Sequence, residues 1–150
     1  MKLFILILFF PSGLSAQLEG KVIGIVDGDT FTLITKDTIK IKIRLAGIDC
    51  PERGQPFANV AKIYLSNLIF SKNVFLKTVG FDRYGRTLAI VFIDAINVNE
   101  SMLRDGMAWH YIEYDDNIIW ANLERMARIN KWGLWVEGNA MPPWEWRKNN

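Results

Sequence analysis

Cysteine and histidine are nearly absent from this sequence of 150 residues, which has one of each. The single Cys50 has no partner for an intramolecular disulfide and cannot build a thiolate metal cluster. The single His110 excludes a multi-histidine zinc site, so any metal ion is expected to be held by oxygen atoms. His110 lies in an apolar segment, and we expect it to be a packed or surface residue rather than a catalyst.

An excess of charge is also missing. The 18 lysines and arginines face 16 aspartates and glutamates, for a net charge of +2, which argues weakly against a DNA-packaging role. It does not argue against an enzyme that contacts a few phosphates and releases them. Half of the residues are hydrophobic and the length suits one compact domain, so we expect a single globular unit without repeats or low-complexity runs.

Long hydrophobic runs are absent too, with one exception near the start of the chain. Residues 3–10 are all apolar, but a transmembrane helix needs about 20 such residues. Lys2 before this run and the small residues that lead to Ala16 after it are typical of a secretory signal peptide. We therefore expect residues 1–16 to be a cleaved signal peptide, residues 17–150 to form the mature domain, and the protein to be secreted or periplasmic. A retained N-terminal anchor is the weaker alternative.

Hydrophobic periodicity predicts five strands and three helices. The strands are expected where residues alternate or are β-branched, at 21–26, 30–35, 39–45, 73–79 and 87–93. The helices are expected over 55–69 with Pro56 in the first turn, from a cap at Asn97 or Asn99 to Gly106, and from a cap at Asp116 through Trp132. Strands that outnumber the helices favour an α+β, mainly β fold built on a small closed barrel.

The last predicted helix carries an apolar stripe along one side. It consists of Ile119, Leu123, Met126, Ala127 and Ile129. Such a stripe is typical of a helix face that packs into the core, and we prefer this interpretation to a groove for a partner.

Acidic and basic residues gather in three short motifs near predicted strand ends. The first, residues 27–30, reads Asp-Gly-Asp-Thr and on its own is typical of a tight turn. The second, residues 44–52, places carboxylates where they would repel one another unless a cation or an arginine lay among them. The third, residues 82–86, is on its own an exposed loop with an ion pair. Together they supply oxygen ligands, two arginines and a free carboxylate, which are the groups that phosphodiester hydrolysis requires.

These motifs resemble those of the thermonuclease family, the family of staphylococcal nuclease. The similar segments are Val-Asp-Gly-Asp-Thr at 26–30, Ile-Arg-Leu-Ala-Gly-Ile-Asp-Cys-Pro-Glu at 43–52 and Asp-Arg-Tyr-Gly-Arg-Thr-Leu-Ala at 82–89, followed by 98–109 and 131–135. They cover nearly the whole predicted mature chain in the family's order. The resemblance implies a five-stranded OB-like β-barrel with three helices and a calcium-dependent endonuclease that acts on DNA and RNA and leaves 3′-phosphate ends.

The resemblance also implies a role for each motif residue. Asp29, Asp49 and the backbone carbonyl of Cys50, where the family often has threonine, correspond to the calcium ligands, with Asp27 and Thr30 as supporting neighbours. Arg44 and Arg86 correspond to the residues that hold the scissile phosphate, and Glu52 to the one that acts on the attacking water, as general base or by orienting it. Calcium accepts irregular shells of about 6–8 oxygens, so two carboxylates, a carbonyl and waters suffice.

A nucleotide-binding wall is implied by Arg83, Tyr84 and Tyr114. The chain departs from the family here, because Ile112 stands where a second tyrosine is expected, so either Tyr111 substitutes for it or base affinity is weaker. In the tail, Trp144 and Trp146 are expected to clamp the chain onto the barrel rather than to contact nucleic acid. We expect a monomer with no stable membrane partner.

Three functions remain open at this point. An active nuclease is preferred because the set Asp29, Arg44, Asp49, Glu52 and Arg86 is complete. The first alternative is a non-catalytic module of the same fold that binds nucleic acid or protein. The second is a purely structural exported protein.

Overall fold

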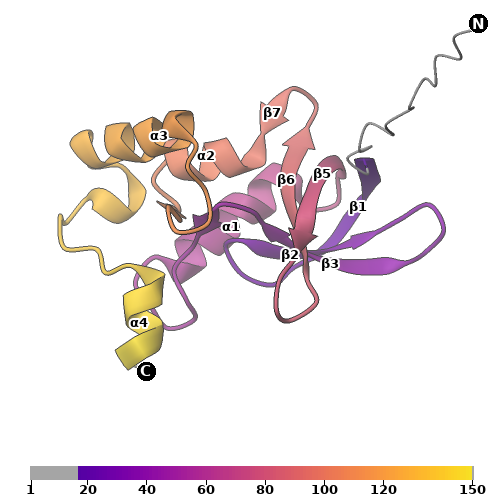
Figure 1. Cartoon of the computed structure of the whole chain (residues 1–150), viewed down its shortest axis with the longest axis horizontal. Coiled ribbons are helices and arrows are strands. Elements are labelled where there is room, and N and C mark those ends of the chain that lie inside the picture. Colours follow the sequence, from indigo (N-terminus) through magenta and orange to yellow (C-terminus); the bar gives the residue numbers. More distant parts are fainter. Residues whose placement is uncertain (1–16, 150) are drawn as a thin grey trace, which may run out of the picture.

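The computed structural model describes residues 17–149, and Figure 1 shows the strands on one side of the molecule and the helices gathered on the other. The predicted signal peptide, residues 1–16, lies outside the described residues. Within residues 17–149, no helix is long and apolar enough to cross a membrane.

The sheet contains five long strands that close into a barrel. They are β1 (Gln17–Ile25), β2 (Thr30–Ile34), β3 (Lys40–Leu45), β5 (Asn73–Phe81) and β6 (Thr87–Ile93), with the short β7 (Ile96–Asn97) at the end of the sheet. Their order is β3-β2-β1-β5-β6-β7, and a parallel pairing between β3 and β6 closes the barrel. The other neighbours pair antiparallel. The predicted mainly β, OB-like barrel of five strands is therefore confirmed.

Alternating side chains explain why these segments close around a core. Every second residue of β6 is buried, and the inner face of the other strands contributes further apolar side chains. The fully buried ones include Phe31, Leu33, Ile43, Val74, Leu76, Ala89 and Val91. β1 begins four residues earlier than predicted, because residues 17–21 pair with β5.

Three two-residue strands among residues 17–149 were not predicted, namely β7 and two strands that pair with each other. β4 (Ile48–Asp49) pairs antiparallel with β8 (Trp109–His110) and forms a separate two-stranded sheet. Two residues are too few for a periodicity to appear in the sequence. This small sheet nevertheless fixes the position of Asp49.

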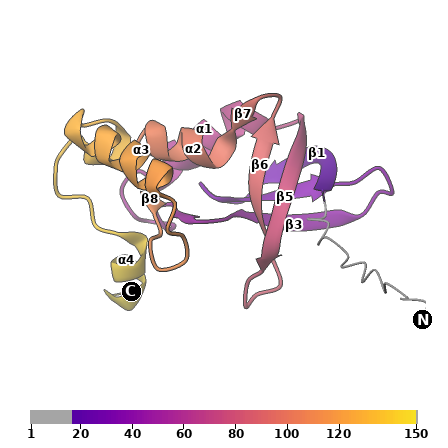
Figure 2. The ribbon, with the colours of Figure 1, turned by 45° about the horizontal axis from the view of Figure 1, so that its top comes forward.

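Residues 17–149 contain four α-helices, one more than predicted. They are α1 (Ala58–Ile69), α2 (Val98–Arg104), α3 (Ile118–Ile129) and α4 (Pro143–Asn149), and a 3-10 turn, η1, spans Gly133–Trp135. α2 packs against α1, α3 and β6. Figure 2 shows α1, α2 and α3 close together, with α4 below them at the end of a long connection. The unpredicted α4 has seven residues and starts at a proline, which is a favoured first position in a helix.

The helix ends differ from prediction in two places. α1 starts at Ala58, so Pro56 precedes the helix instead of lying in its first turn. The cap of α3 is Asn117 rather than Asp116, because the Asn117 side chain accepts hydrogen bonds from the backbone N–H groups of Ile119 and Trp120. For α2, the cap is Asn97 and not Asn99.

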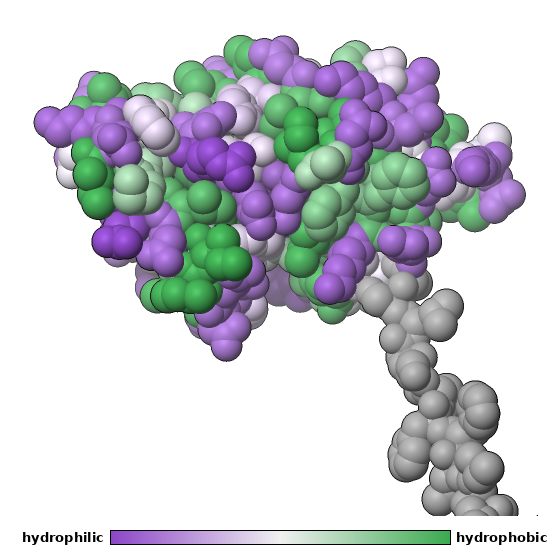
Figure 3. Space-filling model, turned by 90° about the horizontal axis from the view of Figure 1, so that it is seen from above, coloured by the Kyte–Doolittle hydropathy of each residue, from purple (hydrophilic) through white to green (hydrophobic). Residues whose placement is uncertain are grey.

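The predicted core stripe of α3 is wrong for most of its members. Ile119, Met126 and Ile129 are 62%, 47% and 63% exposed, whereas Ala127 is fully buried. The bulky Trp120 takes the buried position, and its indole N–H donates to Glu100 on α2 over 3.2 Å. Burying this largest side chain sets the rotation of the helix and turns the isoleucines outward. Figure 3 shows apolar side chains exposed among polar ones on the face of the molecule seen from above.

Asn99 has a different role from the predicted cap. Its side chain is fully buried, accepts a hydrogen bond from Val91 N over 3.0 Å, and donates to the carbonyls of Ala46 and Ala89 over 2.9 and 3.3 Å. It therefore ties α2 to β6 and to the connection that follows β3.

Replacing Asn99 by alanine is expected to lower the free energy of unfolding by about 3 kcal/mol, because buried backbone groups lose their partners. Asn67→Ala, at an exposed position of α1, is the matched control and should change stability by less than about 0.5 kcal/mol. Urea unfolding followed by circular dichroism measures both. Equal effects of the two substitutions would contradict the role of Asn99.

Candidate functional site

The fold brings the three sequence motifs together at one end of the barrel. The register between β2 and β3 places Thr30 directly opposite Arg44, which joins the first motif to the second. The short pairing of β4 with β8 then holds Asp49 close to both. The loop between β5 and β6 carries the third motif to the same place.

Asp29 is the most firmly held carboxylate of the site. One carboxylate oxygen, Oδ2, accepts the backbone N–H of Cys50 over 2.9 Å, and the other, Oδ1, accepts the Thr30 hydroxyl over 3.0 Å and pairs with Arg44. Burial works against the charge of Asp29, but Arg44 and the hydrogen bond from Cys50 outweigh it and hold its pKa below the ordinary value. Asp29 is therefore ionised at neutral pH.

Arg44 lies between two buried carboxylates. Its Nη1 pairs with Asp29, and its Nη2 donates to Asp49 Oδ1 over 2.8 Å. Burial disfavours the charged guanidinium, yet Asp29 and Asp49 together raise the pKa of Arg44. Burial, with a smaller contribution from Asp29, raises the pKa of Asp49. A planar fork bridges two carboxylates in this way and keeps further N–H donors in a fixed geometry, which a single ammonium group does not provide.

Arg86 joins the site through the loop between β5 and β6. Asp82 organises this loop by accepting the backbone N–H groups of Tyr84 and Arg86, each over 2.9 Å, and the Arg86 Nε over 2.6 Å. Arg86 Nη1 then donates to the Thr30 hydroxyl over 3.2 Å. Thr30 thus links Asp29 to Arg86, and all three motifs meet through hydrogen bonds.

Glu52 and Asp27 flank this centre. Glu52 follows β4, its side chain is 39% exposed, and its backbone N–H donates to the Gln55 side chain over 2.9 Å. Asp27 accepts the backbone N–H of Asp29 over 3.1 Å. Burial, together with the charge of Asp29, raises the pKa of Asp27 to about 6. Asp27 therefore keeps its proton to a higher pH than an exposed aspartate does.

The residues predicted to contact a nucleotide form two separate groups. Tyr84 is exposed, and the guanidinium carbons of Arg83 and Arg86 lie 4.9 and 5.5 Å from its ring centroid. Tyr114 is exposed elsewhere, edge to face with Tyr111 at 4.7 Å. Tyr84 is therefore connected to the site through Arg86, whereas Tyr114 belongs to an aromatic group that includes Tyr111.

One residue of the site was missed in the sequence. Arg147 on α4 donates from Nη2 to Asp49 Oδ2 over 2.9 Å and from Nη1 to Glu52 Oε1 over 2.6 Å. No local pattern marks Arg147, since about 95 residues separate it from Glu52.

The ring of Trp144 stacks flat on Tyr111, with the ring centroids 5.2 Å apart. This tryptophan therefore clamps the tail as predicted, although onto the segment after β8 rather than onto the barrel strands.

His110 and Cys50 are both buried. His110 packs beside Trp120 on α3, and its Nε2 lies 2.7 Å from an Asp115 carboxylate oxygen, which agrees with the prediction of a packed residue. The Cys50 thiol is free, and burial raises its pKa well above the ordinary value. Only the backbone of Cys50 takes part in the hydrogen bonds of the site.

The donor chemistry fits a hard cation held by oxygen. In the described part of the chain, no three carboxylate, histidine or cysteine side chains converge closely enough to hold a metal ion by themselves. Asp29 and Asp49 are nevertheless adjacent through Arg44, and Asp27 lies beside them and accepts the backbone N–H of Asp29. An ion here would need further oxygens from the backbone, from water or from a substrate, as calcium accepts.

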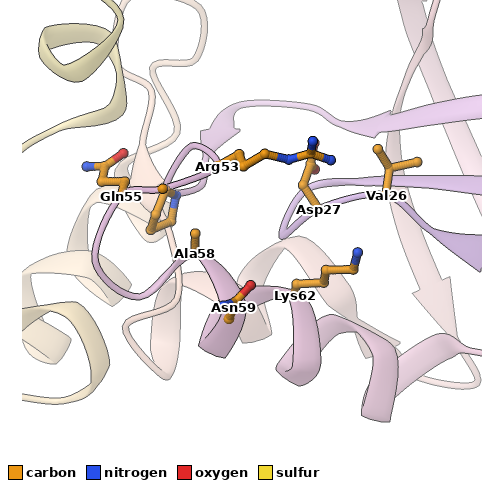
Figure 4. A pocket seen from close by; sticks show the side chains of 9 residues that line it. Val26, Asp27, Arg53, Gln55, Ala58, Asn59 and Lys62 are labelled. Atoms are coloured by element: carbon orange, nitrogen blue, oxygen red, sulfur yellow. The ribbon is translucent and has the colours of Figure 1, made fainter. Parts of the chain in front are cut away.

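A cavity of about 220 Å³ lies next to the site. It is lined by Val26, Asp27, Pro51, Arg53, Gly54, Gln55, Ala58, Asn59 and Lys62. Figure 4 shows the Arg53 side chain extending across it towards Asp27. Because Asp29, Arg44 and Arg86 do not line this cavity, it neighbours the site without containing it.

Comparison with known proteins relates the chain to nucleases. Residues 42–137 match the model of a family described as staphylococcal nuclease homologue. A Haemophilus influenzae protein named an uncharacterized endonuclease is 43% identical over 128 residues, which cover 85% of this chain and 72% of that protein. A Shigella flexneri protein named micrococcal nuclease is 38% identical over 145 residues, which cover 89% and 82% of the two chains.

Gly28 is required by close packing beneath the first motif. A Cβ atom at this position would lie 2.9 Å from the Cβ atoms of both Ala61 and Cys50. We expect Gly28→Ala to lower the free energy of unfolding by about 1–3 kcal/mol, because neither neighbour can move without its backbone. Gly24→Ala is the matched control, since its Cβ would meet no atom within 4 Å. Thermal unfolding distinguishes the two, and a Gly28→Ala protein as stable as the control would refute the packing argument.

Proposed function

The chain belongs to the staphylococcal nuclease family, and on that premise we propose that it is a calcium-dependent endonuclease that hydrolyses phosphodiester bonds in DNA and RNA and leaves 3′-phosphate ends. Relatives named endonuclease and micrococcal nuclease support nuclease activity in general. One observation carries the finer proposal: two arginines converge on Asp29. Arg44 pairs with Asp29 directly, and Arg86 is linked to it through the hydroxyl of Thr30.

Arg44 and Arg86 are proposed to hold the scissile phosphate. Both guanidinium groups are oriented before substrate arrives, Arg44 by Asp29 and Asp49, and Arg86 by Asp82 and Thr30. A guanidinium matches the geometry of two phosphate oxygens, and a preorganised positive charge stabilises the negative charge that builds up in the transition state. Their side chains are only partly exposed, so little water competes with these contacts.

Glu52 is proposed to act on the attacking water, either as a general base or by orienting it. Its side chain is more exposed than those of Asp29 and Asp49, as a group that contacts water requires. It lies beside Asp49, because one guanidinium, that of Arg147, reaches both carboxylates.

Asp29, Asp49 and the carbonyl of Cys50 are proposed to hold the calcium ion, with Asp27 and Thr30 as supporting neighbours. When bound, calcium would neutralise the clustered carboxylates and attract a phosphate oxygen. The cysteine at position 50 is compatible with this role, because its buried side chain points into the core and only its carbonyl is required.

Arg83, Tyr84 and Tyr114 are proposed to contact the nucleotide. An exposed tyrosine ring can stack on any base, which suits an enzyme without sequence preference. Ile112 is exposed and adds no aromatic ring, so base contacts would come from the tyrosines on either side of it.

We propose further that the protein is exported, with cleavage after Ala16, and that it acts as a monomer without a stable membrane partner.

The first test is cleavage of heat-denatured DNA with calcium and with a chelator, for the wild type and Glu52→Gln. We expect cleavage to require calcium and to fall by about 100-fold or more in Glu52→Gln, which cannot accept a proton. Glu137→Gln, at an exposed position, is the matched control and should keep the wild-type rate.

A Glu52→Gln protein that cleaves at the wild-type rate would remove Glu52 from the mechanism. A folded wild type that binds DNA but cleaves nothing with any divalent metal would favour the non-catalytic binding module.

Arg44→Lys is expected to lower the cleavage rate by about 100-fold, although the charge is kept. One ammonium group cannot pair with both Asp29 and Asp49 and also grip a phosphate with two parallel hydrogen bonds. Arg125→Lys is the matched control, because Arg125 is exposed on α3 and bonds only to Asn122, over 3.2 Å, among the described contacts. Steady-state rates at saturating DNA measure the effect. More than half of the wild-type rate in Arg44→Lys would contradict a two-pronged grip.

A further inference from the structure

The C-terminal segment is fixed beside the acidic residues by contacts that do not involve charge. Trp144 stacks on Tyr111, with the ring planes 5° apart. Gln55, which also holds the backbone of Glu52, donates from Nε2 to the carbonyl of Met141 over 2.6 Å. Ala140 and Trp144 pack against a buried cluster of Trp109, Ala127, Leu134 and Trp135. Figure 1 shows α4 as the last element of the chain, apart from the barrel.

Arg147 projects from this fixed segment into the acidic site. Its guanidinium donates to both oxygens of Asp49, from Nη2 to Oδ2 over 2.9 Å and from Nη1 to Oδ1 over 3.4 Å. Nη1 also donates to Oε1 of Glu52 over 2.6 Å. One fork therefore bridges a proposed calcium ligand and the residue proposed to act on water. Arg147 is 39% exposed, so it lies at the mouth of the site rather than in its interior.

The charges of the site explain why a cation is favoured at this point. The carboxylates of Asp27, Asp29, Asp49 and Glu52 are neighbours linked through hydrogen bonds, without three of them converging on one point, and Arg44 pairs with only two of them. The guanidinium of Arg147 forms an ion pair with the other oxygen of Asp49, Oδ2, and another with Glu52. A divalent ion bound to Asp49 would use carboxylate oxygens that already accept hydrogen bonds from Arg147. An oxygen that accepts a charged hydrogen bond is a poorer metal ligand, so the ion and Arg147 compete for it.

We propose that Arg147 is a positioning residue of the active site, a tethered cation that orders Asp49 and Glu52 in the metal-free protein and competes with the divalent ion for their oxygens. It thereby sets the metal concentration at which the site loads. The inference rests on the proposed function, since it takes Asp49 as a metal ligand. The aromatic stack keeps the segment in place whether or not the guanidinium is paired, so Arg147 can leave the carboxylates without unfolding of α4.

Calorimetric titration with calcium tests the competition without any measurement of cleavage. Arg147→Gln is expected to bind calcium about fivefold more tightly than the wild type, because an exposed ion pair contributes up to about that factor. Lys148→Gln removes the same charge from the neighbouring, exposed position of α4 and should bind within twofold of the wild type. Unchanged or weaker binding in Arg147→Gln, or an equal gain in Lys148→Gln, would overturn the inference.

Thermal unfolding supplies a second readout that a merely structural arginine would not produce. With a chelator, Arg147→Gln should melt at a lower temperature than the wild type, because Asp49 and Glu52 lose their partner. With saturating calcium the two should melt together. An equal loss under both conditions would assign Arg147 a structural role only.

The two proposals fail differently in these experiments. A wild type that binds no calcium would contradict both the calcium-dependent function and the competition. A wild type that binds calcium, with an Arg147→Gln protein of the same affinity, would contradict only the role of Arg147.

Discussion

The buried pairing of Arg44 with Asp29 and Asp49 is the constraint on which the rest of the site depends. Two carboxylates that lose water are costly to the fold unless their charge is compensated within hydrogen-bond distance. Arg44 provides that compensation from β3, and the register with β2 and the small β4–β8 sheet place the partners around it. Every other polar group of the site, including Thr30 and the loop that ends in Arg86, is attached to this centre.

Most of the barrel follows from alternation in the sequence, and the site follows from the barrel. Segments with apolar residues at every second position favour strands with one buried face, and short turns join β1 to β2, β2 to β3 and β5 to β6 as antiparallel pairs. The pairings of β1 with β5 and of β3 with β6 join distant segments and do not follow from the turns. The three motifs could be placed together for the same reason, since each lies at an end of such a strand. Family resemblance added the roles of the residues, which strand geometry alone does not determine.

The features that sequence reasoning missed depend on contacts between distant segments. The strands β4 and β8 are two residues long and exist only because they meet each other. The face of α3 that is buried is decided by Trp120, whose pocket is formed by α2 and the turn at Gly47. Arg147 belongs to the site because an aromatic stack between Trp144 and Tyr111 holds its helix there. None of these contacts leaves a periodic signal in the chain.

The close packing around Gly28 affects the reactivity of the neighbouring Cys50 thiol. Cys50 is enclosed by the first motif and by α1, and its pKa is raised, so the sulfur stays protonated and out of reach of solvent. Thiolates, not thiols, attack disulfides and are oxidised readily. The same packing that supports the acidic loop thus shields the protein's one sulfhydryl, and we expect copies of the chain not to become covalently joined through it in air.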